Sequence, residues 1–403
     1  MSNFNKFIRD SVHGDIHLQE KIIYELINTY EYQRLRRITQ LGGGQFVFPS
    51  ANHTRFSHGL GVYHLICKFL ENSGFDTLPE MQKIEVKVAG LLHDIGHGPF
   101  SHSFEGVTGT KHEEFSQEII TGATEINEIL LKYKVNPENV AAIIGGVHKN
   151  PILNSLVSSQ LDADRLDYLT RDSYNCGVNY SKLDIDWIVR HATVVDDKIV
   201  YPQKTVYAIE SYLLGRYHMY QQVYRHPVSI SFDVILKKWF KRLTDLFNQG
   251  FKFLNQEDVK LFEAFFLKQK ISLENYLKLD DYTLIDFIKK CSKENDKILA
   301  DLSLRIIKRD FFGYFTETEY QSVEDKIQKL NLDSDYYLEK LTLSSVAMYN
   351  HDNKVSKDET IYIVDKFGKI VGLEKVSQIA AIKDFSKDKK LNSENIYIFP
   401  KIM

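Results

Sequence analysis

The sequence has few cysteines, no long apolar run and no excess of charge, and each absence narrows the possible functions. Cys67, Cys176 and Cys291 lie far apart and form no CxxC pair, so they predict neither a disulfide framework nor a cysteine-ligated zinc site. No stretch reaches the ~18 apolar residues of a membrane span, and the first residues lack a signal-peptide pattern. We therefore expect a soluble, cytoplasmic protein with reduced thiols and no membrane partner.

The charge of the chain is nearly balanced. Its 51 basic and 54 acidic residues give a net charge of −3, which provides no bulk attraction for nucleic acid. We expect no specific nucleic-acid partner. Ten of the 13 arginines nevertheless lie before residue 226, and arginine is the residue best suited to bidentate recognition of phosphate or carboxylate. Polyanion chemistry is therefore expected in the first part of the chain.

Hydrophobic periodicity predicts a mainly α fold with small β hairpins. Helical spacing covers residues 60–72, 81–94, 112–132, 155–171, 205–225, 228–248, 256–305 and 320–330. Strand signals are short: a hairpin at 193–201, a second at 360–373 and a final strand at 395–402. The sequence becomes rich in lysine and poor in histidine near residue 250. We therefore predict a catalytic core at 1–250 and an α+β region at 251–403 that packs on the core or builds an oligomer.

Histidines concentrate in one part of the chain, where seven of the 14 lie between His53 and His112. In the stretch "GLLHDIGHGPFSHSFE" (90–105), two glycines and a proline end an amphipathic helix. His93 and Asp94 then fall in its last turn, and His97 and His102 follow on a flexible loop. An imidazole beside a carboxylate suits a divalent metal, and the absence of cysteine ligands argues against structural zinc.

Two residues do not complete a metal site, and two other stretches offer further ligands. "NHTRFSHGLGVYHL" places His58 near the start of a helix, with Arg55 beside it. "SSQLDADRLDYLTRDSYN" offers Asp162, Asp164, Asp167 and Asp172. Within it, Asp164, Tyr168 and Asp172 recur every four residues and form one polar stripe. A solvated acidic helix face is the alternative interpretation of that stripe.

A later helix, "IESYLLGRYHMYQQVYRH", carries Arg216, Tyr220 and Tyr224 at the same four-residue spacing. An arginine with two tyrosines would be unusual in a core. The stripe is better suited to the wall of a pocket, where the guanidinium binds phosphate and a tyrosine packs on a sugar.

Taken in order, these blocks resemble the HD-domain phosphohydrolases. Within them, the chain is most similar to the deoxynucleoside triphosphate triphosphohydrolases (dGTPase-like enzymes), including the vertebrate branch with a sterile-alpha-motif domain. The resemblance runs from about Lys6 to about residue 240. It places the H…HD…D metal signature of an HD-domain helical core on His58, His93, Asp94 and Asp164. It implies one divalent metal there (Mg, Mn, Fe, Ni or Zn), with additional Mg bound to the nucleotide.

The resemblance implies hydrolysis of a dNTP at the α-phosphorus, which releases a deoxynucleoside and intact triphosphate. His102, oriented by Glu105, would protonate the leaving oxygen, and His97 and His112 would lie beside the phosphates. The implied substrate-binding residues are Arg55, Arg165 and Arg216 for the triphosphate, Gln40, Leu41 and Tyr224 around the deoxyribose, Asp172 at the 3′-hydroxyl, and Tyr168 and Tyr220 in the pocket wall.

The resemblance further implies a homotetramer that a second nucleotide activates at a subunit interface. Lys6, Gln33 and Arg36 match positions that bind the activating guanine nucleotide. Asn28 stands in place of the aspartate that reads guanine, and Thr193 stands in place of an arginine. A carboxylate accepts from both guanine N–H groups, whereas an amide has one acceptor oxygen. Selectivity for guanine is therefore not expected to transfer.

Two alternatives remain at this point. The chain could be an HD phosphohydrolase that acts on a mono-, di- or cyclic nucleotide or an alarmone, which release of inorganic triphosphate would exclude. It could also be a catalytically silent nucleotide sensor. The intact metal set and the pairing of His102 with Glu105 favour an enzyme.

Overall fold

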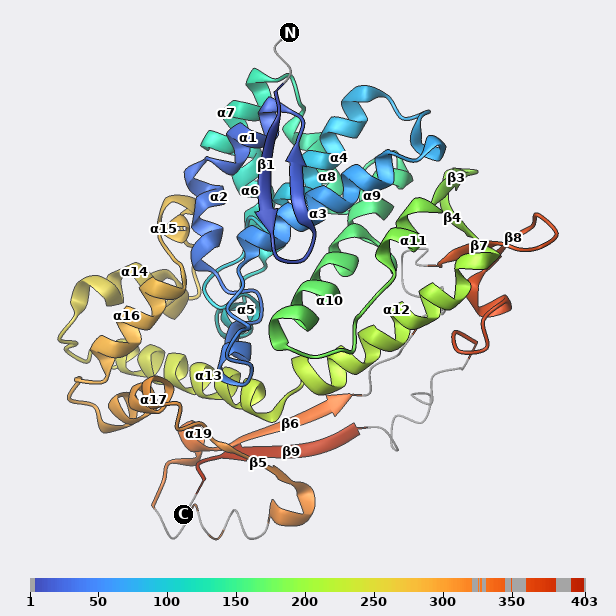
Figure 1. The fold of residues 1–403 in the computed structure, drawn as a ribbon. Helices are drawn as coiled ribbons and strands as arrows, with labels where there is room; N and C mark the ends of the chain where they lie inside the picture. Colours follow the sequence, from blue (N-terminus) through green and yellow to red (C-terminus); the bar gives the residue numbers. More distant parts are fainter. Residues whose placement is uncertain are drawn as a thin grey trace.

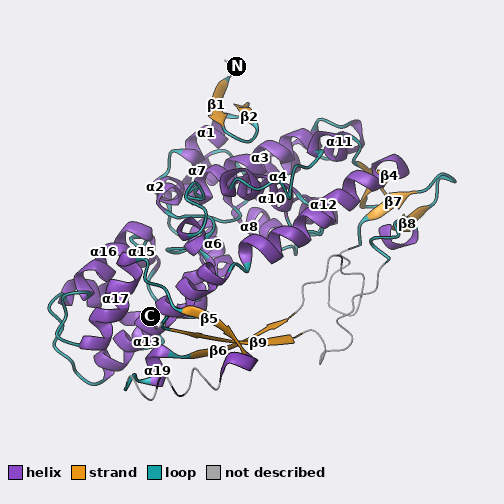
Figure 2. Cartoon of the chain, turned by 60° about the horizontal axis from the view of Figure 1, so that its bottom comes forward, coloured by secondary structure: helices purple, strands orange, loops and turns teal. Residues whose placement is uncertain are grey.

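The computed structural model describes residues 4–320, 331–344, 360–381 and 393–401, with the single positions Asp325, Ile327 and Tyr349. Helices dominate the described chain and three small sheets lie at its edges (Figures 1 and 2), which confirms the predicted mainly α fold. Up to residue 219 the elements are β1 (Lys6–Asp10), β2 (Gly14–Leu18), α1 (Lys21–Ile27), α2 (Tyr30–Arg34), α3 (Arg55–Leu70), α4 (Glu80–Leu92), α5 (His102–Thr108), α6 (His112–Thr121), α7 (Glu125–Lys132), α8 (Pro137–Ile144), α9 (Pro151–Val157), α10 (Ala163–Cys176), α11 (Ile185–Arg190), β3 (Thr193–Val195), β4 (Lys198–Pro202) and α12 (Val206–Met219).

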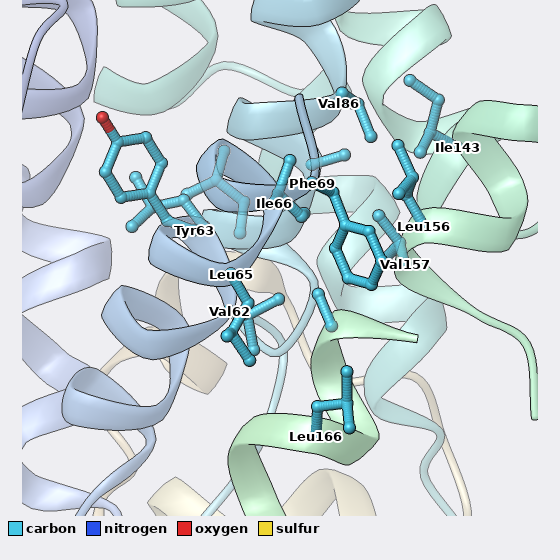
Figure 3. Close-up of a cluster of buried hydrophobic side chains, with 14 of the residues drawn as sticks. Val62, Tyr63, Leu65, Ile66, Phe69, Val86, Ile143, Leu156, Val157 and Leu166 are labelled. Atoms are coloured by element: carbon cyan, nitrogen blue, oxygen red, sulfur yellow. The ribbon is translucent and has the colours of Figure 1, made fainter. Parts of the chain in front are cut away.

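The centre of the first part is α3, which packs against α4 and α10. Its apolar residues meet side chains from four other helices (Figure 3), and the labelled cluster comprises Val62, Tyr63, Leu65, Ile66, Phe69, Val86, Ile143, Leu156, Val157 and Leu166. Gly61 of α3 has no side chain because a Cβ there would overlap the Asp167 carboxylate of α10. This close approach of α3 and α10 brings His58 near the acidic face of α10.

Three predicted helices are interrupted. Residues 112–132 form α6 and α7, because the helix ends at Gly122 and Thr124 caps the next one. Residues 155–171 divide between α9 and α10, where the Asp162 side chain accepts a hydrogen bond from the Arg165 amide and starts α10. In the third, α12 ends at Met219 and continues as a π-helical turn over Tyr220–Tyr224.

The remaining elements are α13 (Pro227–Asn248), α14 (Gln256–Phe266), α15 (Leu273–Leu277), α16 (Asp281–Cys291), α17 (Lys297–Lys308), β5 (Gly313–Thr316), α19 (Ser334–Tyr337), β6 (Glu339–Ser344), β7 (Tyr362–Val364), β8 (Ile370–Gly372) and β9 (Ser393–Phe399). Helix α13 packs against α17, α19 and β5 around a second hydrophobic core rich in phenylalanine. The boundary at residue 250 stays a prediction.

The predicted strands are present. Hairpin β3–β4 and hairpin β7–β8 join in one sheet of order β3-β4-β7-β8, in which β4 and β7 run parallel, with Val200 opposite Tyr362. The predicted final strand is β9, the central strand of the sheet β5-β9-β6. The helix predicted at 320–330 lies largely outside the described residues. Among the described helices, none has both the length and the apolar character needed to cross a membrane.

Candidate active site

Four side chains of the predicted metal set converge at the contact of α3, the end of α4 and the start of α10. His58 Nε2 lies 3.2 Å from His93 Nε2, 3.4 Å from Asp94 Oδ2 and 3.0 Å from Asp164 Oδ1. His93 Nε2 lies 3.4 Å from the same two carboxylate oxygens. Two imidazole nitrogens and two carboxylate oxygens therefore face one point, which is a donor set for a divalent metal.

The other ring nitrogen of each histidine is already occupied. His58 Nδ1 lies 2.7 Å from Asp167 Oδ2, and His93 Nδ1 lies 2.9 Å from the Gly90 carbonyl oxygen. A hydrogen on each Nδ1 would satisfy these acceptors and leave each Nε2 lone pair directed at the common point. Carboxylate and carbonyl partners of this kind are typical behind metal-binding histidines. The residues present therefore fit a bound metal.

The electrostatics of the four groups also suit a cation. Burial alone would raise the pKa of Asp94, but the Arg55 guanidinium and nearby histidines hold it well below its usual value. Burial would also raise the pKa of Asp164, but the hydrogen bonds with His58 and His93 hold it below its usual value. Although burial disfavours the charged imidazole, the surrounding carboxylates raise the pKa of His58 to about 10. A metal bound here would displace that proton.

A second cluster lies at α5 and α6, beside the metal set. Glu105 lies 2.5 Å from His102 Nδ1 through one oxygen and 2.6 Å from His112 Nδ1 through the other. Burial would raise the pKa of Glu105, but the hydrogen bonds from both histidines hold it below its usual value. An ionised carboxylate therefore orients two imidazoles at once.

His97 completes this cluster. Its ring stacks on His112 with centroids 3.8 Å apart, and it is fully buried. Burial and the Arg55 guanidinium lower the pKa of His97 well below its usual range, so the ring is neutral. His97 Nε2 lies 3.3 Å from Asp94 Oδ1, which places the histidine cluster in contact with the metal set.

Both clusters open onto one cavity of about 520 Å³. Its lining includes twelve of the residues predicted for the site: Gln40, Leu41, Arg55, Asp94, His97, His102, His112, Asp164, Tyr168, Asp172, Tyr220 and Tyr224. Gly42–Gly44, Phe100, Ser103, Val223, Ser229 and Asp233 complete it. The three glycines form a short 3-10 turn in the wall of the cavity.

Eight residues beyond Asp164 on α10, the cavity wall is built around Asp172. One Asp172 oxygen accepts a hydrogen bond from the Tyr224 hydroxyl at 2.8 Å, and the other lies 2.8 Å from His53 Nε2. The buried amide oxygen of Gln40 has no hydrogen-bond partner among the described residues. This end of the cavity therefore presents an unused acceptor beside a fixed carboxylate.

Three predicted arginines differ in their surroundings. Arg55 donates to Asp94 at 2.5 Å and to Ser101 Oγ at 2.9 Å, so its guanidinium contacts the metal set directly. Arg165 lies outside the cavity lining and pairs with Asp162 at 3.5 Å. Arg216 also lies outside the lining, 5.9 Å from the centre of the Tyr220 ring, and its buried Nε has no hydrogen-bond partner in the described chain.

The residues predicted for the activating nucleotide lie away from the cavity. Lys6 is exposed on β1, and Asn28 ends α1 with its amide donating to the Tyr24 carbonyl. Gln33 accepts a hydrogen bond from Arg36, whose guanidinium covers the Phe56 ring at 3.5 Å. The last three lie close together, on or beside α1 and α2.

The acidic stretch offered Asp167 only as a further ligand candidate, and neither Arg171 nor Asp10 was singled out from the sequence. Asp167 contacts His58, His13 Nε2 at 2.6 Å and the buried Arg171 guanidinium at 2.8 Å, and Asp10 holds the far side of Arg171. The four-residue spacing of Asp167 and Arg171 was the available signal. Asp233 of α13 was also missed. Burial raises its pKa to about 6, and it accepts a hydrogen bond from Ser103.

Comparison with known proteins agrees with this geometry. Residues 55–172 match the HD domain, and residues 183–382 match the HD associated region. Bacillus subtilis YwfO is 38% identical over 98% of this chain and 92% of its own length. The solved structure of a phosphohydrolase from Bacteroides thetaiotaomicron has a TM-score of 0.83 at 30% identity and covers 99% of this chain and 100% of its own.

The chain therefore belongs to the HD-domain phosphohydrolase family and carries the HD associated region. Within that family it is similar to proteins named deoxynucleoside triphosphate triphosphohydrolase SAMHD1. The human protein is 28% identical over 95% of this chain and 65% of its own length. The Dictyostelium discoideum homolog is 32% identical over 63% of this chain and 51% of its own.

Proposed function

We propose that this protein is a metal-dependent triphosphohydrolase that converts a dNTP into a deoxynucleoside and inorganic triphosphate. One observation carries the proposal: a single cavity is lined by Asp94 and Asp164 of the metal set, by His102 and by the Asp172–Tyr224 wall. The similarity to deoxynucleoside triphosphate triphosphohydrolases supports this choice of substrate over other nucleotides.

A divalent metal held by His58, His93, Asp94 and Asp164 would supply Lewis-acid activation of a phosphoryl oxygen and of water. Hydrolysis adds the oxygen of water to the α-phosphorus and breaks its bond to the 5′ oxygen, which then needs a proton. With its Nδ1–H directed at Glu105, the imidazolium form of His102 would donate that proton from Nε2. Such positioned proton transfer contributes about 10²–10⁴-fold to the rate.

The remaining residues bind and orient the substrate. His97 is neutral and His112 is fixed by Glu105, so both offer hydrogen bonds to phosphate oxygens with little competition from water. Arg55 contributes positive charge beside them. Arg165 and Arg216 lie behind the cavity wall and act on the triphosphate only if they turn toward it. We assign the additional Mg to the triphosphate itself.

At the other end, Asp172 would bind the 3′-hydroxyl and Gln40 would lie beside the deoxyribose, because both residues line the cavity. Tyr224 donates to Asp172, so its ring is fixed in place. Together with Leu41, this ring would crowd the 2′ carbon and exclude ribonucleotides by steric clash. Tyr168 and Tyr220 extend the same wall.

We further propose a homotetramer that a second nucleotide activates at Lys6, Asn28, Gln33 and Arg36. Arg36 covers Phe56, which lies two residues before His58 on α3. Nucleotide binding at Arg36 could therefore act on the metal set through the start of this helix. Light scattering with and without saturating dNTP tests this part, and a monomer under both conditions would contradict it.

Product analysis tests the main proposal. The protein is incubated with Mn²⁺ or Mg²⁺ and each dNTP singly, then with all four together, and the products are separated by ion exchange. We expect deoxynucleoside and intact triphosphate. Monophosphate with pyrophosphate would place the cleavage at another bond and contradict the role of His102. No turnover with any nucleotide or metal would favour a sensor.

A further inference from the structure

The loop between α4 and α5, residues 96–101, carries His97 and leads directly into His102. Two of its residues adopt an unusual backbone: φ is +53° at Phe100 and +54° at Ser101, and neither is glycine. Side chains disfavour this conformation, so the surroundings must hold it. We call residues 96–101 the histidine loop, and the groups that hold it lie on neighbouring elements.

Residues 276–281, which run from the end of α15 to the start of α16, contact the histidine loop. The Tyr276 hydroxyl donates to the Gly96 carbonyl at 2.7 Å, and the Phe100 amide donates to Asp281 Oδ1 at 2.6 Å. Both donors and acceptors are buried. Residues 276–281 thus bind the loop at both ends, and we call them the clamp segment.

Arg34 ties the middle of the loop to the same segment. This fully buried guanidinium donates to the His97 carbonyl at 2.8 Å and to the Leu279 carbonyl at 2.8 Å. The carbonyl group of His97 therefore depends on an arginine that the clamp segment holds in place.

Asp281 also reaches the histidine loop through Thr39. Its Oδ2 accepts from the Thr39 amide at 3.0 Å and from the Thr39 hydroxyl at 2.8 Å. The Thr39 carbonyl in turn accepts a hydrogen bond from Ser101 Oγ at 2.6 Å, and Ser101 Oγ itself accepts one from Arg55 Nε. One buried carboxylate thus fixes Phe100 directly and Ser101 through Thr39, the two residues with positive φ.

We propose that Asp281 and Tyr276 are positioning residues that hold His97 and His102 in their working geometry. The region after residue 250 therefore completes the active site as well as packing on it. Neither residue lines the cavity, so they act through the histidine loop without touching substrate. Only the effect on turnover depends on the proposed dNTP hydrolysis, because the clamp itself is a contact within the protein.

The neighbouring Asp280 provides a matched control. It lies 2.5 Å from Arg37 Nε and caps α16 through the Thr283 amide at 2.9 Å, and among the described residues its side chain makes no hydrogen bond to the histidine loop. Asp280→Asn retains a capping oxygen. Asp281→Asn replaces one acceptor oxygen by an amide donor, which must then face either Phe100 N–H or the two donors of Thr39.

The test compares the full-length Asp281→Asn, Tyr276→Phe and Asp280→Asn variants with the unsubstituted protein. Amide hydrogen exchange over residues 96–104 is measured without substrate, together with metal content and thermal unfolding. We expect faster exchange in Asp281→Asn and, to a smaller extent, in Tyr276→Phe, but not in Asp280→Asn. With dNTP, kcat should fall about 10- to 100-fold in Asp281→Asn, with KM and metal content unchanged.

Each result is decisive. Equal exchange and equal kcat in Asp281→Asn and Asp280→Asn would overturn the proposal, and so would a parallel loss of metal, which would place the effect at the metal set. If Asp281→Asn does not fold, Tyr276→Phe, which loses one hydroxyl, decides by the same criteria. If the unsubstituted protein does not hydrolyse dNTPs, the proposed function fails, but the exchange comparison still decides the clamp.

Discussion

The carboxylate of Asp167 lies 2.7 Å from Nδ1 of His58, so a residue outside the metal set orients one that belongs to it. The same carboxylate binds Arg171, whose far side is held by Asp10. The metal set is therefore the inner end of a buried chain of charges that reaches the N-terminal hairpin β1–β2.

The first prediction concerns this chain of charges. Asp167→Asn should weaken metal affinity about 10- to 100-fold, because the amide is a poorer acceptor for His58 Nδ1–H. It should also destabilise the fold by about 3–5 kcal/mol, since the buried Arg171 loses one of its two carboxylate partners. Metal competition titration measures the first effect. Asp10→Asn, which also affects Arg171, should keep the affinity, and an equal loss in both variants would contradict the role of Asp167.

The second prediction concerns Glu105. Glu105→Gln should lower kcat by about 10²–10⁴, because His102 and His112 lose the ionised carboxylate that orients them. The metal content should not change. Glu113→Gln is the control, since Glu113 lies 3.6 Å from His112 but is largely exposed. Steady-state kinetics with metal analysis distinguish a catalytic loss from loss of the metal.

The third prediction concerns acid stability through His64 on α3. Burial and the neighbouring His13 and Lys68 lower the pKa of His64 to about 4. In the unfolded chain, the His64 imidazole has a pKa near 6.5. Between pH 6.5 and pH 4 the unfolded chain therefore binds more protons than the folded protein, so stability falls as the pH drops through this range. The loss attributable to His64 is about 2–3 kcal/mol.

His64→Leu should remove this part of the pH dependence. Because other groups titrate in the same range, the measured quantity is the difference in unfolding free energy between His64→Leu and the unsubstituted protein at pH 7 and pH 4.5. As a control, the exposed His218 is replaced by glutamine. The difference in unfolding free energy between this variant and the unsubstituted protein should be the same at both pH values. If the free energy of unfolding falls equally with pH in His64→Leu and in the unsubstituted protein, His64 does not contribute to the acid sensitivity.

The fourth prediction separates the ring of Tyr224 from its hydroxyl. Tyr224→Ala should increase hydrolysis of ribonucleotides relative to deoxynucleotides, because it removes the group proposed to crowd the 2′ carbon. Tyr224→Phe keeps the ring and loses only the hydrogen bond to Asp172, which is worth about 1 kcal/mol. It should therefore retain the discrimination. The ratio of kcat/KM for a dNTP and its ribonucleotide is the measurement, and equal ratios in all three proteins would contradict the prediction.

The mainly α fold could be predicted from the sequence because helices depend on short-range patterns. The metal set drew on local signals in part, and His58 and Asp164 joined His93 and Asp94 only through the family resemblance. His93 and Asp94 are adjacent, and the four-residue spacing of Asp164, Tyr168 and Asp172 places all three on the cavity wall. The ends of long helices were less accurate, since a single Gly122 and a cap at Thr124 divide a stretch whose apolar spacing continues across them.

The contacts between distant parts of the chain could not be predicted. His53 meets Asp172, and Phe100 meets Asp281, across more than a hundred residues in each case. No periodicity links such pairs, and a buried aspartate at the start of α16 has the same local signal as an ordinary helix cap. The positive φ of Phe100 and Ser101 was equally hidden, because that conformation usually requires glycine.

Two contacts join early parts of the chain to late ones: the parallel pairing of β4 with β7, and the hydrogen bond from Phe100 to Asp281. Both can form only late in synthesis, so they affect the order in which the protein folds on the ribosome. The metal-binding residues leave the ribosome first, but the strand that closes the β3–β4 sheet follows only at Tyr362–Val364. Because domains fold from the N-terminus as they emerge, the nascent chain passes through a stage with a finished metal set, an open sheet edge and a histidine loop without its clamp. A newly made molecule should therefore bind metal before it can turn over substrate.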